Sequence, residues 1–269
     1  GEEIFTLRVE GDEAKGKVQG ARGEEWTHVL TDNAEEDMPR IEVYRAIRRE
    51  GDEARKWLFS VAMVANAPIC CEIECNEDFT KGVLYMMPDC QDVRFCIDNA
   101  LMLLFAFRTA PMMTLEMHAA VVVRGEARGY LFLGHSGTGK STHARQWLAA
   151  FDDAWLLNDD NPILRVMEDG EVRVYGSPWS GKTPCYKNAY ARVGGIVKLS
   201  QAPHNKIRTI SLPEAYAYML SSASGLKMDR QMADCMYESI KHVITHVKCY
   251  HLDCLPNTEA AEVAQRGMV

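Results

Sequence analysis

The residues best suited to chemistry lie in a glycine-rich stretch between residues 130 and 150. This stretch contains the pattern G-x-x-x-x-G-K-[ST], with Gly134, Gly139, Lys140 and Ser141 at the required places. Glycines let successive backbone N–H groups turn toward phosphate oxygens, and a helix that begins at the lysine adds the positive end of its dipole. The lysine then reaches the β- and γ-phosphates, while the serine hydroxyl ligates Mg²⁺. The stretch therefore predicts a phosphate loop that binds ATP with Mg²⁺.

The sequence on either side of this loop has the context that the motif needs. A short apolar run, 130–133, precedes it, and Ala144, Trp147 and Leu148 follow at helical spacing. A glycine-rich turn that binds nothing is the alternative, but it would seldom bring Gly-Lys-Ser to the start of a helix. Nucleotide contacts are expected from Gly134, Ser136, Gly137, Thr138, Gly139, Lys140, Ser141 and Thr142.

Two adjacent acids, Asp159 and Asp160, end the next apolar run, 154–158. Phosphoryl transfer needs a metal ligand beside the loop and a group that positions or deprotonates the nucleophile. Acids at the carboxyl end of a neighbouring strand meet both needs, and adjacent strand residues point to opposite sides, so the two can divide these roles. A solvated Asp-Asp turn ahead of Pro162 is the alternative.

Three further sites remain open from the residues alone. Lys182, in a polar loop over 176–191, is a candidate for a phosphate or substrate contact, and a solvated loop lysine is equally compatible. His118 lies on an apolar run, where a histidine is more often a core residue than a functional one. His242 and His246 share a helix face ahead of Cys249, His251 and Cys254, but the glutamate of an H-E-x-x-H zinc site is absent.

Composition excludes some classes of partner. A net charge of -8 argues against general binding of nucleic acids or anionic membranes. No apolar run is expected to reach the roughly 18 residues of a membrane helix, because Asp98 and Arg108 flank 100–106. Nine cysteines, an odd number, fit a reduced cytoplasmic protein better than a disulfide framework. The chain begins at Gly1, which leaves a removed signal open.

Hydrophobic patterning predicts a two-part α/β organisation. Residues 1–113 read as a β-rich accessory segment with a mostly antiparallel sheet, ending in a helix over 92–108. Residues 114–269 read as the phosphate-loop domain. Its expected elements are a strand over 114–123, a hairpin turn at 124–126, a hairpin over 163–175, a strand over 194–199, helices over 213–222, 229–247 and 258–265, and a strand over 249–255.

The order of these segments resembles the HPr kinase/phosphorylase family. The matching segments are the strand with His118, the hairpin after it, the 134–141 loop and the strand that ends at Asp159 and Asp160. The catalytic domain of that family is related to phosphoenolpyruvate carboxykinase. The resemblance covers roughly residues 114–200 well and the C-terminal helices loosely. It implies an α/β domain with a mixed sheet that binds ATP and Mg²⁺.

The resemblance also implies roles for individual residues. The first aspartate of the family pair is the base toward a serine hydroxyl and the second helps to hold the metal, which here gives Asp159 and Asp160. His118 would assist the base, Lys140 would stabilise the transferred phosphoryl group, and Ser141 would share the metal. The family's Glu-Ile-Arg-Gly type signature is missing after the acidic strand, and 176–184 stands in its place. The substrate and any phosphorylase activity therefore stay open.

Together these features predict a cytoplasmic kinase that transfers the γ-phosphoryl group of ATP to a hydroxyl, of a protein serine or a small molecule. Its expected partners are the nucleotide and an unidentified acceptor, with no nucleic acid and no membrane, while homo-oligomerisation is open. One alternative is a nucleotide-binding regulatory switch without phosphotransfer. Another is a carboxykinase-type enzyme, which is disfavoured because those enzymes are much larger and carry additional metal and substrate ligands.

Overall fold

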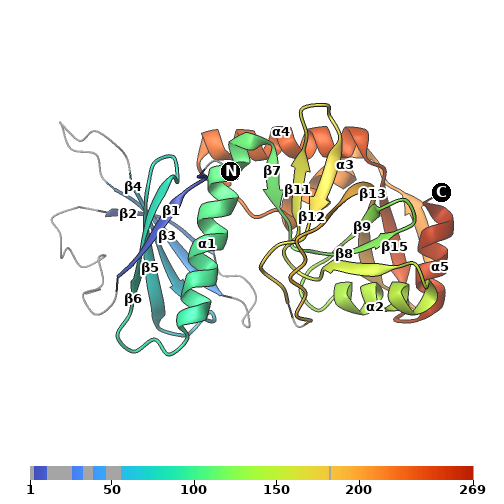
Figure 1. The fold of residues 1–269 in the computed structure, drawn as a ribbon, viewed down its shortest axis with the longest axis horizontal. Coiled ribbons are helices and arrows are strands. Elements are labelled where there is room, and N and C mark those ends of the chain that lie inside the picture. The colour runs from blue at the N-terminus through green and yellow to red at the C-terminus, as the bar shows by residue number, and fades with distance from the viewer. Residues whose placement is uncertain (1–2, 11–25, 33–38, 47–55, 182, 269) are drawn as a thin grey trace. The chain divides into compact units, whose positions relative to one another are not determined.

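The computed structural model describes residues 3–10, 26–32, 39–46, 56–181 and 183–268 (Figure 1). Its contacts divide the chain into two compact units, Gly1–Thr109 and Ala110–Val269. The boundary predicted from the sequence lies four positions later, after residue 113. Both units combine helices with a mixed sheet, so the protein is a mixed α/β protein.

The first unit is a six-stranded sheet with one described helix packed on it. Its strands are β1 (Thr6–Glu10), β2 (Trp26–Asp32), β3 (Arg40–Ala46), β4 (Lys56–Ala62), β5 (Ile69–Asn76) and β6 (Lys81–Met86), in the order β1-β6-β5-β4-β3-β2. Neighbours are antiparallel except β1 and β6, which are parallel. Helix α1 (Val93–Thr109) contacts β5 and β6, and the Phe107 ring packs against Phe59 and Phe79.

The helical segment Val93–Met112, which is α1 followed by the 3-10 turn η2 (Ala110–Met112), is long and apolar enough to cross a membrane by length and composition. The sequence predicts no such segment, because Asp98 and Arg108 flank its apolar run. In the structure both residues lie inside the helix. The helix buries Cys96, Ala100, Leu104 and Phe107 within its own unit.

The second unit is built on a nine-stranded mixed sheet. The strands are β7 (Thr114–Glu116), β8 (Ala119–Arg124), β9 (Arg128–Leu133), β10 (Trp155–Asn158), β11 (Ile163–Val166), β12 (Val172–Tyr175), β13 (Tyr190–Gln201), β14 (Lys206–Thr209) and β15 (Cys249–Cys254). The order is β10-β8-β9-β13-β12-β11-β7, and β15 pairs with both β13 and β14. Strand β13 runs parallel to β9 and β15, and the other pairs are antiparallel.

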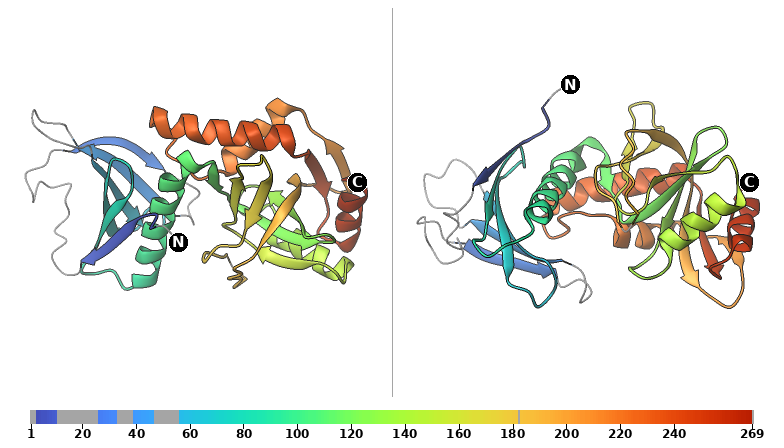
Figure 2. Two further views of the ribbon diagram at one scale, coloured as in Figure 1. Left: turned by 45° about the horizontal axis from the view of Figure 1, so that its top comes forward. Right: turned by 60° about the horizontal axis from the view of Figure 1, so that its bottom comes forward.

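Helices cover both faces of this second sheet (Figure 2). On one face, α2 (Lys140–Ala150) and α5 (Thr258–Gly267) contact each other and bury Trp147, Ala261 and Ala264 against Phe132 and Val197. On the other face, α3 (Leu212–Ser222) and α4 (Arg230–His246) bury a core that includes Met219, Met236, Ile240, Val243, Leu131 and Leu164. The unit therefore has a helix–sheet–helix arrangement.

The single strand expected over 114–123 is wrong in one respect, because the structure splits it in two. Strand β7 pairs with β11 at one edge of the sheet, whereas β8 pairs with β9 and β10. Between them, the Met117 N–H donates to the Pro162 carbonyl and the His118 N–H donates to the Ser222 carbonyl. The backbone thus changes partners at His118, which apolar patterning alone does not reveal.

Candidate functional site

The turn from β9 to α2 is shaped by glycines that no other residue could replace without strain. Gly137 and Gly139 have φ angles of 75° and 105°, in the left-handed region that disfavours residues with a Cβ. A Cβ at Gly134 would lie 2.9 Å from the Thr138 side chain. Helix α2 begins directly after Gly139, and among the described residues no side chain caps its first N–H groups. The expected strand, loop and helix therefore follow one another as the motif requires.

Lys140 is the first residue of α2, and its side chain is buried against the loop. Its ammonium nitrogen donates to the carbonyl oxygens of Gly134 at 3.0 Å and His135 at 3.4 Å. The same nitrogen lies 3.0 Å from Nε2 of His118. An ammonium group carries donors and no acceptor, so His118 Nε2 must be the acceptor of this hydrogen bond. The ring proton of a neutral His118 is then on Nδ1.

Asp160 approaches His118 from the turn that follows β10. Its Oδ1 lies 3.4 Å from His118 Nε2, and its Oδ2 accepts a hydrogen bond of 3.1 Å from the Asn161 side chain. The turn is fixed by Asn158, whose Oδ1 accepts the N–H groups of Asp160 and Asn161. About a third of the Asp160 and His118 side chains is exposed, so both are open to a ligand.

Asp159 has a different environment from Asp160, as expected for neighbours at a strand end. It is 2% exposed, and its two carboxylate oxygens accept the N–H groups of Gly181 and Thr183, each at 2.9 Å. Asn158 adds to this anchor, because its side chain donates to Ser177 Oγ and to the Trp179 carbonyl. The end of β10 thus holds Ser177, Trp179, Gly181 and Thr183 in place. Sequence reasoning missed Asn158, whose only signal was a polar side chain at the end of an apolar run.

Glu116 is a second residue that sequence reasoning missed. It is 1% exposed at the end of β7, and its Oε1 atom has no hydrogen-bond partner among the described residues. Burial, with a smaller contribution from the charge of Asp160, raises the pKa of Glu116 to about 8. The sequence carried no signal for it, because a single glutamate in an apolar stretch gives no sign of its burial.

The remaining predicted residues of the loop lie between the end of β9 and the first turn of α2. Ser141 and Thr142 are in the first turn of α2, half-buried, and Ser136 is exposed at the tip of the loop. Gln201, at the end of β13, donates from its side chain to the Gly137 carbonyl at 3.1 Å. Among the described residues, no hydrogen bond joins Ser141 to Asp160. Lys182 lies outside the described part of the chain.

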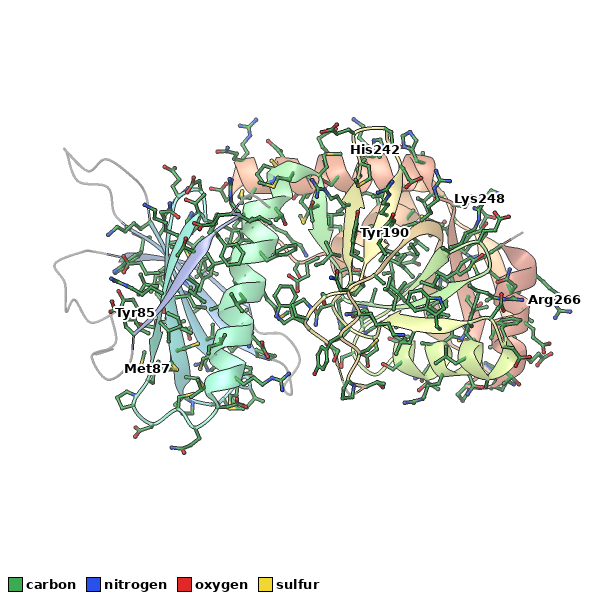
Figure 3. All side chains as sticks on the ribbon, viewed as in Figure 1. Tyr85, Met87, Tyr190, His242, Lys248 and Arg266 are labelled. Carbon is green, nitrogen blue, oxygen red and sulfur yellow. The ribbon has the colours of Figure 1, made fainter. Side chains whose placement is uncertain are left out.

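The histidines and cysteines near the C-terminus do not converge. The His242 and His246 rings stack at 4.0 Å, and His242 Nε2 lies 3.2 Å from the Gly170 carbonyl in the β11–β12 turn (Figure 3). His251 instead contacts Asp253. Within the described ranges, no three histidine, cysteine, aspartate or glutamate side chains are grouped so that they could hold a metal ion. The structure therefore gives no support for a zinc site there.

Comparisons with known proteins add a fold-level hint. No protein-family model matches the chain, and no curated protein matches it in sequence. Among solved structures, the chain is similar to the Hpr(Ser) kinase/phosphatase from Coxiella burnetii, with 13% sequence identity and a TM-score of 0.31. The match covers 56% of this chain and 94% of that one.

Proposed function

We propose that the protein is an ATP- and Mg²⁺-dependent kinase that transfers the γ-phosphoryl group to a hydroxyl of a protein or a small molecule. The observation that carries this proposal is the meeting of His118, Lys140 and Asp160 beside the glycine-rich turn. These residues come from three separate segments of the chain. An ammonium for phosphate charge, a carboxylate and an imidazole are groups that phosphoryl transfer uses.

In this proposal the 134–141 loop binds the phosphates of the nucleotide. The N–H groups at the start of α2 and the positive φ of Gly137 and Gly139 provide a concave run of donors, as anions require. Lys140 is already directed into the loop by its bonds to Gly134 and His135. A phosphate oxygen is a stronger acceptor for an ammonium than a neutral carbonyl, so Lys140 would exchange these partners for the nucleotide.

The residues present fit a Mg²⁺ ion. Mg²⁺ prefers oxygen ligands and is usually held by one or two carboxylates together with substrate phosphates and water. Asp160 offers a partly exposed carboxylate, and Ser141 offers a hydroxyl one residue after Lys140. Glu116 Oε1 has no hydrogen-bond partner among the described residues, so this region has a further oxygen that accepts no hydrogen bond within the protein. When bound, the ion would neutralise charge on the phosphates.

The base of the reaction is assigned to Asp159, with Asp160 as the alternative. Each Asp159 oxygen accepts one amide N–H, and a carboxylate oxygen has a further lone pair for a second donor. The two amides hold its orientation, which a base needs. Asp160 is more exposed and lies beside His118, so it could take the same proton if the acceptor hydroxyl approaches from that side.

The test is transfer of label from γ-labelled ATP, with Mg²⁺, into protein and small-molecule fractions of a cell extract. Wild type is compared with Asp160→Asn and with Asp152→Asn, an exposed aspartate in the turn after α2 as the matched control. The proposal expects transfer by wild type and by the control, and loss of transfer in Asp160→Asn. Wild-type protein that binds ATP but transfers no label would contradict the kinase and favour a nucleotide-dependent switch.

Asp159→Asn needs a separate readout, because this change also affects the backbone at Gly181 and Thr183. The asparagine amide group would present a donor to one of the two backbone N–H groups that Asp159 now accepts. Thermal unfolding therefore accompanies its activity assay. If the variant still binds ATP and keeps its thermal unfolding midpoint but has lost transfer, Asp159 is the base. If the variant transfers at the full rate, another residue is the base.

A further inference from the structure

We propose that Glu116 and Asp160 together bind a divalent cation of the Mg²⁺ type, and that they bind it before any nucleotide arrives. The inference rests on the proposed function in one point, the assignment of Asp160 as a metal ligand. It adds a residue, Glu116, and an order of events, in which the metal binds to the free protein.

The backbone places Glu116 beside the Asp160 turn. Leu115 and Met117 belong to the core that α3 and α4 cover, so Glu116, which lies between them, faces away from that core. Two residues further along the chain, His118 Nε2 lies 3.4 Å from Asp160 Oδ1. The two segments also run side by side, because Glu116 is paired with Ile163 and the Ala119 N–H donates to the Asp160 carbonyl at 2.9 Å.

The Glu116 side chain is buried, and its Oε1 atom has no hydrogen-bond partner in the described part of the chain. Glu116 is 1% exposed, and no donor among the described residues reaches this oxygen. A buried carboxyl group without a donor or a cation is costly to ionise, and ionised buried groups in proteins are normally paired or bound to metals. A cation shared with Asp160 would remove the cost and also the repulsion between the two carboxylates.

The chemistry of the site favours Mg²⁺ or Mn²⁺ over zinc. Two carboxylates are a sufficient protein contribution for Mg²⁺, which keeps several water ligands. Zinc and softer metals prefer sets of three or four histidine and cysteine ligands, and the described residues include no such group. The ligands here are hard oxygens, and His118 Nε2 already accepts from Lys140.

The experiment is Mn²⁺ binding to the full chain without nucleotide, followed by the electron paramagnetic resonance signal of free Mn²⁺. Wild type is compared with Glu116→Gln, Glu116→Asp and Asp160→Asn. Glu72→Gln is the matched control, since Glu72 is a similarly buried glutamate in the other unit. We expect binding by wild type and by the control, and a loss of about tenfold or more in affinity for Glu116→Gln and for Asp160→Asn. Glu116→Asp, which keeps the charge, should lie between.

Several outcomes would overturn the inference. One is wild-type protein that binds no Mn²⁺ without nucleotide, and another is unchanged affinity in Glu116→Gln. Circular dichroism and unfolding midpoints show whether each variant is folded, and Glu116→Asp supplies the comparison if Glu116→Gln is not. The test is separable from that of the kinase. If Mn²⁺ binding depends on Glu116 but the protein transfers no phosphoryl group, only the kinase proposal is contradicted. If the protein transfers the phosphoryl group but Mn²⁺ binding does not depend on Glu116, only this inference is contradicted.

Discussion

Nε2 of His118 lies 3.0 Å from the ammonium nitrogen of Lys140 and accepts a hydrogen bond from it. The relationship sets the chemistry of both side chains. His118 is neutral with its proton on Nδ1, so its 3.4 Å approach to Asp160 is a contact of two acceptors and not an ion pair. Departure of Lys140 toward a phosphate would free Nε2 to carry a proton and donate it to Asp160.

The first prediction concerns this tautomer. We expect the ¹⁵N spectrum of nucleotide-free protein to show His118 with a protonated Nδ1 and an unprotonated Nε2. Addition of ATP and Mg²⁺ should change the Nε2 signal, because Lys140 leaves it for the phosphates. The resonance is assigned by its loss in His118→Gln. An Nε2-protonated ring in the free protein would contradict the hydrogen bond from Lys140.

A second prediction concerns Lys140→Met, which keeps much of the side-chain length and removes the ammonium. We expect transfer to fall by about 10²- to 10³-fold, as for other preorganised charged donors. The Gly134 and His135 carbonyls also lose their donor, so the free energy of unfolding should fall by about 1–2 kcal/mol. Both are measured beside Lys248→Met, an exposed lysine (Figure 3). Wild-type rates in Lys140→Met would contradict the mechanism.

A third prediction follows from the raised pKa of Glu116, about 8 in the folded protein against about 4.5 when exposed. Between these values the folded state holds a proton that the unfolded state has released. Stability should therefore fall as pH rises from about 5 to 8, and the loss should be complete above the folded pKa. Glu116→Gln removes this slope, so the variant should exceed wild type most at pH 9 without metal.

Urea unfolding from pH 5 to 9 in the presence of a chelator measures this difference. The expected gain of Glu116→Gln at the alkaline end is on the order of a few kcal/mol. Glu126→Gln, at an exposed turn position, is the control and should show no such gain. A gain that is the same at every pH would mean that the charge of Glu116 is not the cause.

A fourth prediction concerns His143 on α2, whose pKa burial lowers to about 4. Trp147 Nε1 donates to His143 Nε2 at 3.0 Å, so the buried ring is neutral with its proton on Nδ1. Its contribution to stability is present above pH 6.5 and is lost as pH falls from there toward 4. Between pH 7 and 4.5, His143→Gln should lose stability less steeply than wild type. His204→Gln, an exposed histidine, should follow wild type.

Local signals in the sequence predicted most of the elements near the site. The strand and helix around the glycine-rich turn, the hairpin of β11 and β12, and α3 appear where they were expected, because glycine spacing, tight turns and helix starts are set within a few residues. Strand β14 was not expected, since its four residues depend on pairing with β15. Apolar periodicity likewise did not predict that His118 separates two strands.

The candidate site divides in the same way between local and tertiary causes. Lys140 and Asp160 could be picked from their neighbours in sequence. Their distances to His118, and the separate environments of Asp159 and Asp160, arise from pairing between segments far apart in the chain. Glu116 could not be picked at all, because an isolated glutamate becomes significant only when packing removes its solvent.

The pairing of strand β13 with three other strands affects how the second unit unfolds. Along its length it bonds first to β12, then to β9 and finally to β15. Two sections of the sheet are therefore hydrogen-bonded to the same strand. One is β7–β11–β12, which holds Glu116, and the other is β9, which leads into Lys140. Because both sections pair with β13, local unfolding of this strand over residues 190–198 would disturb both halves of the site.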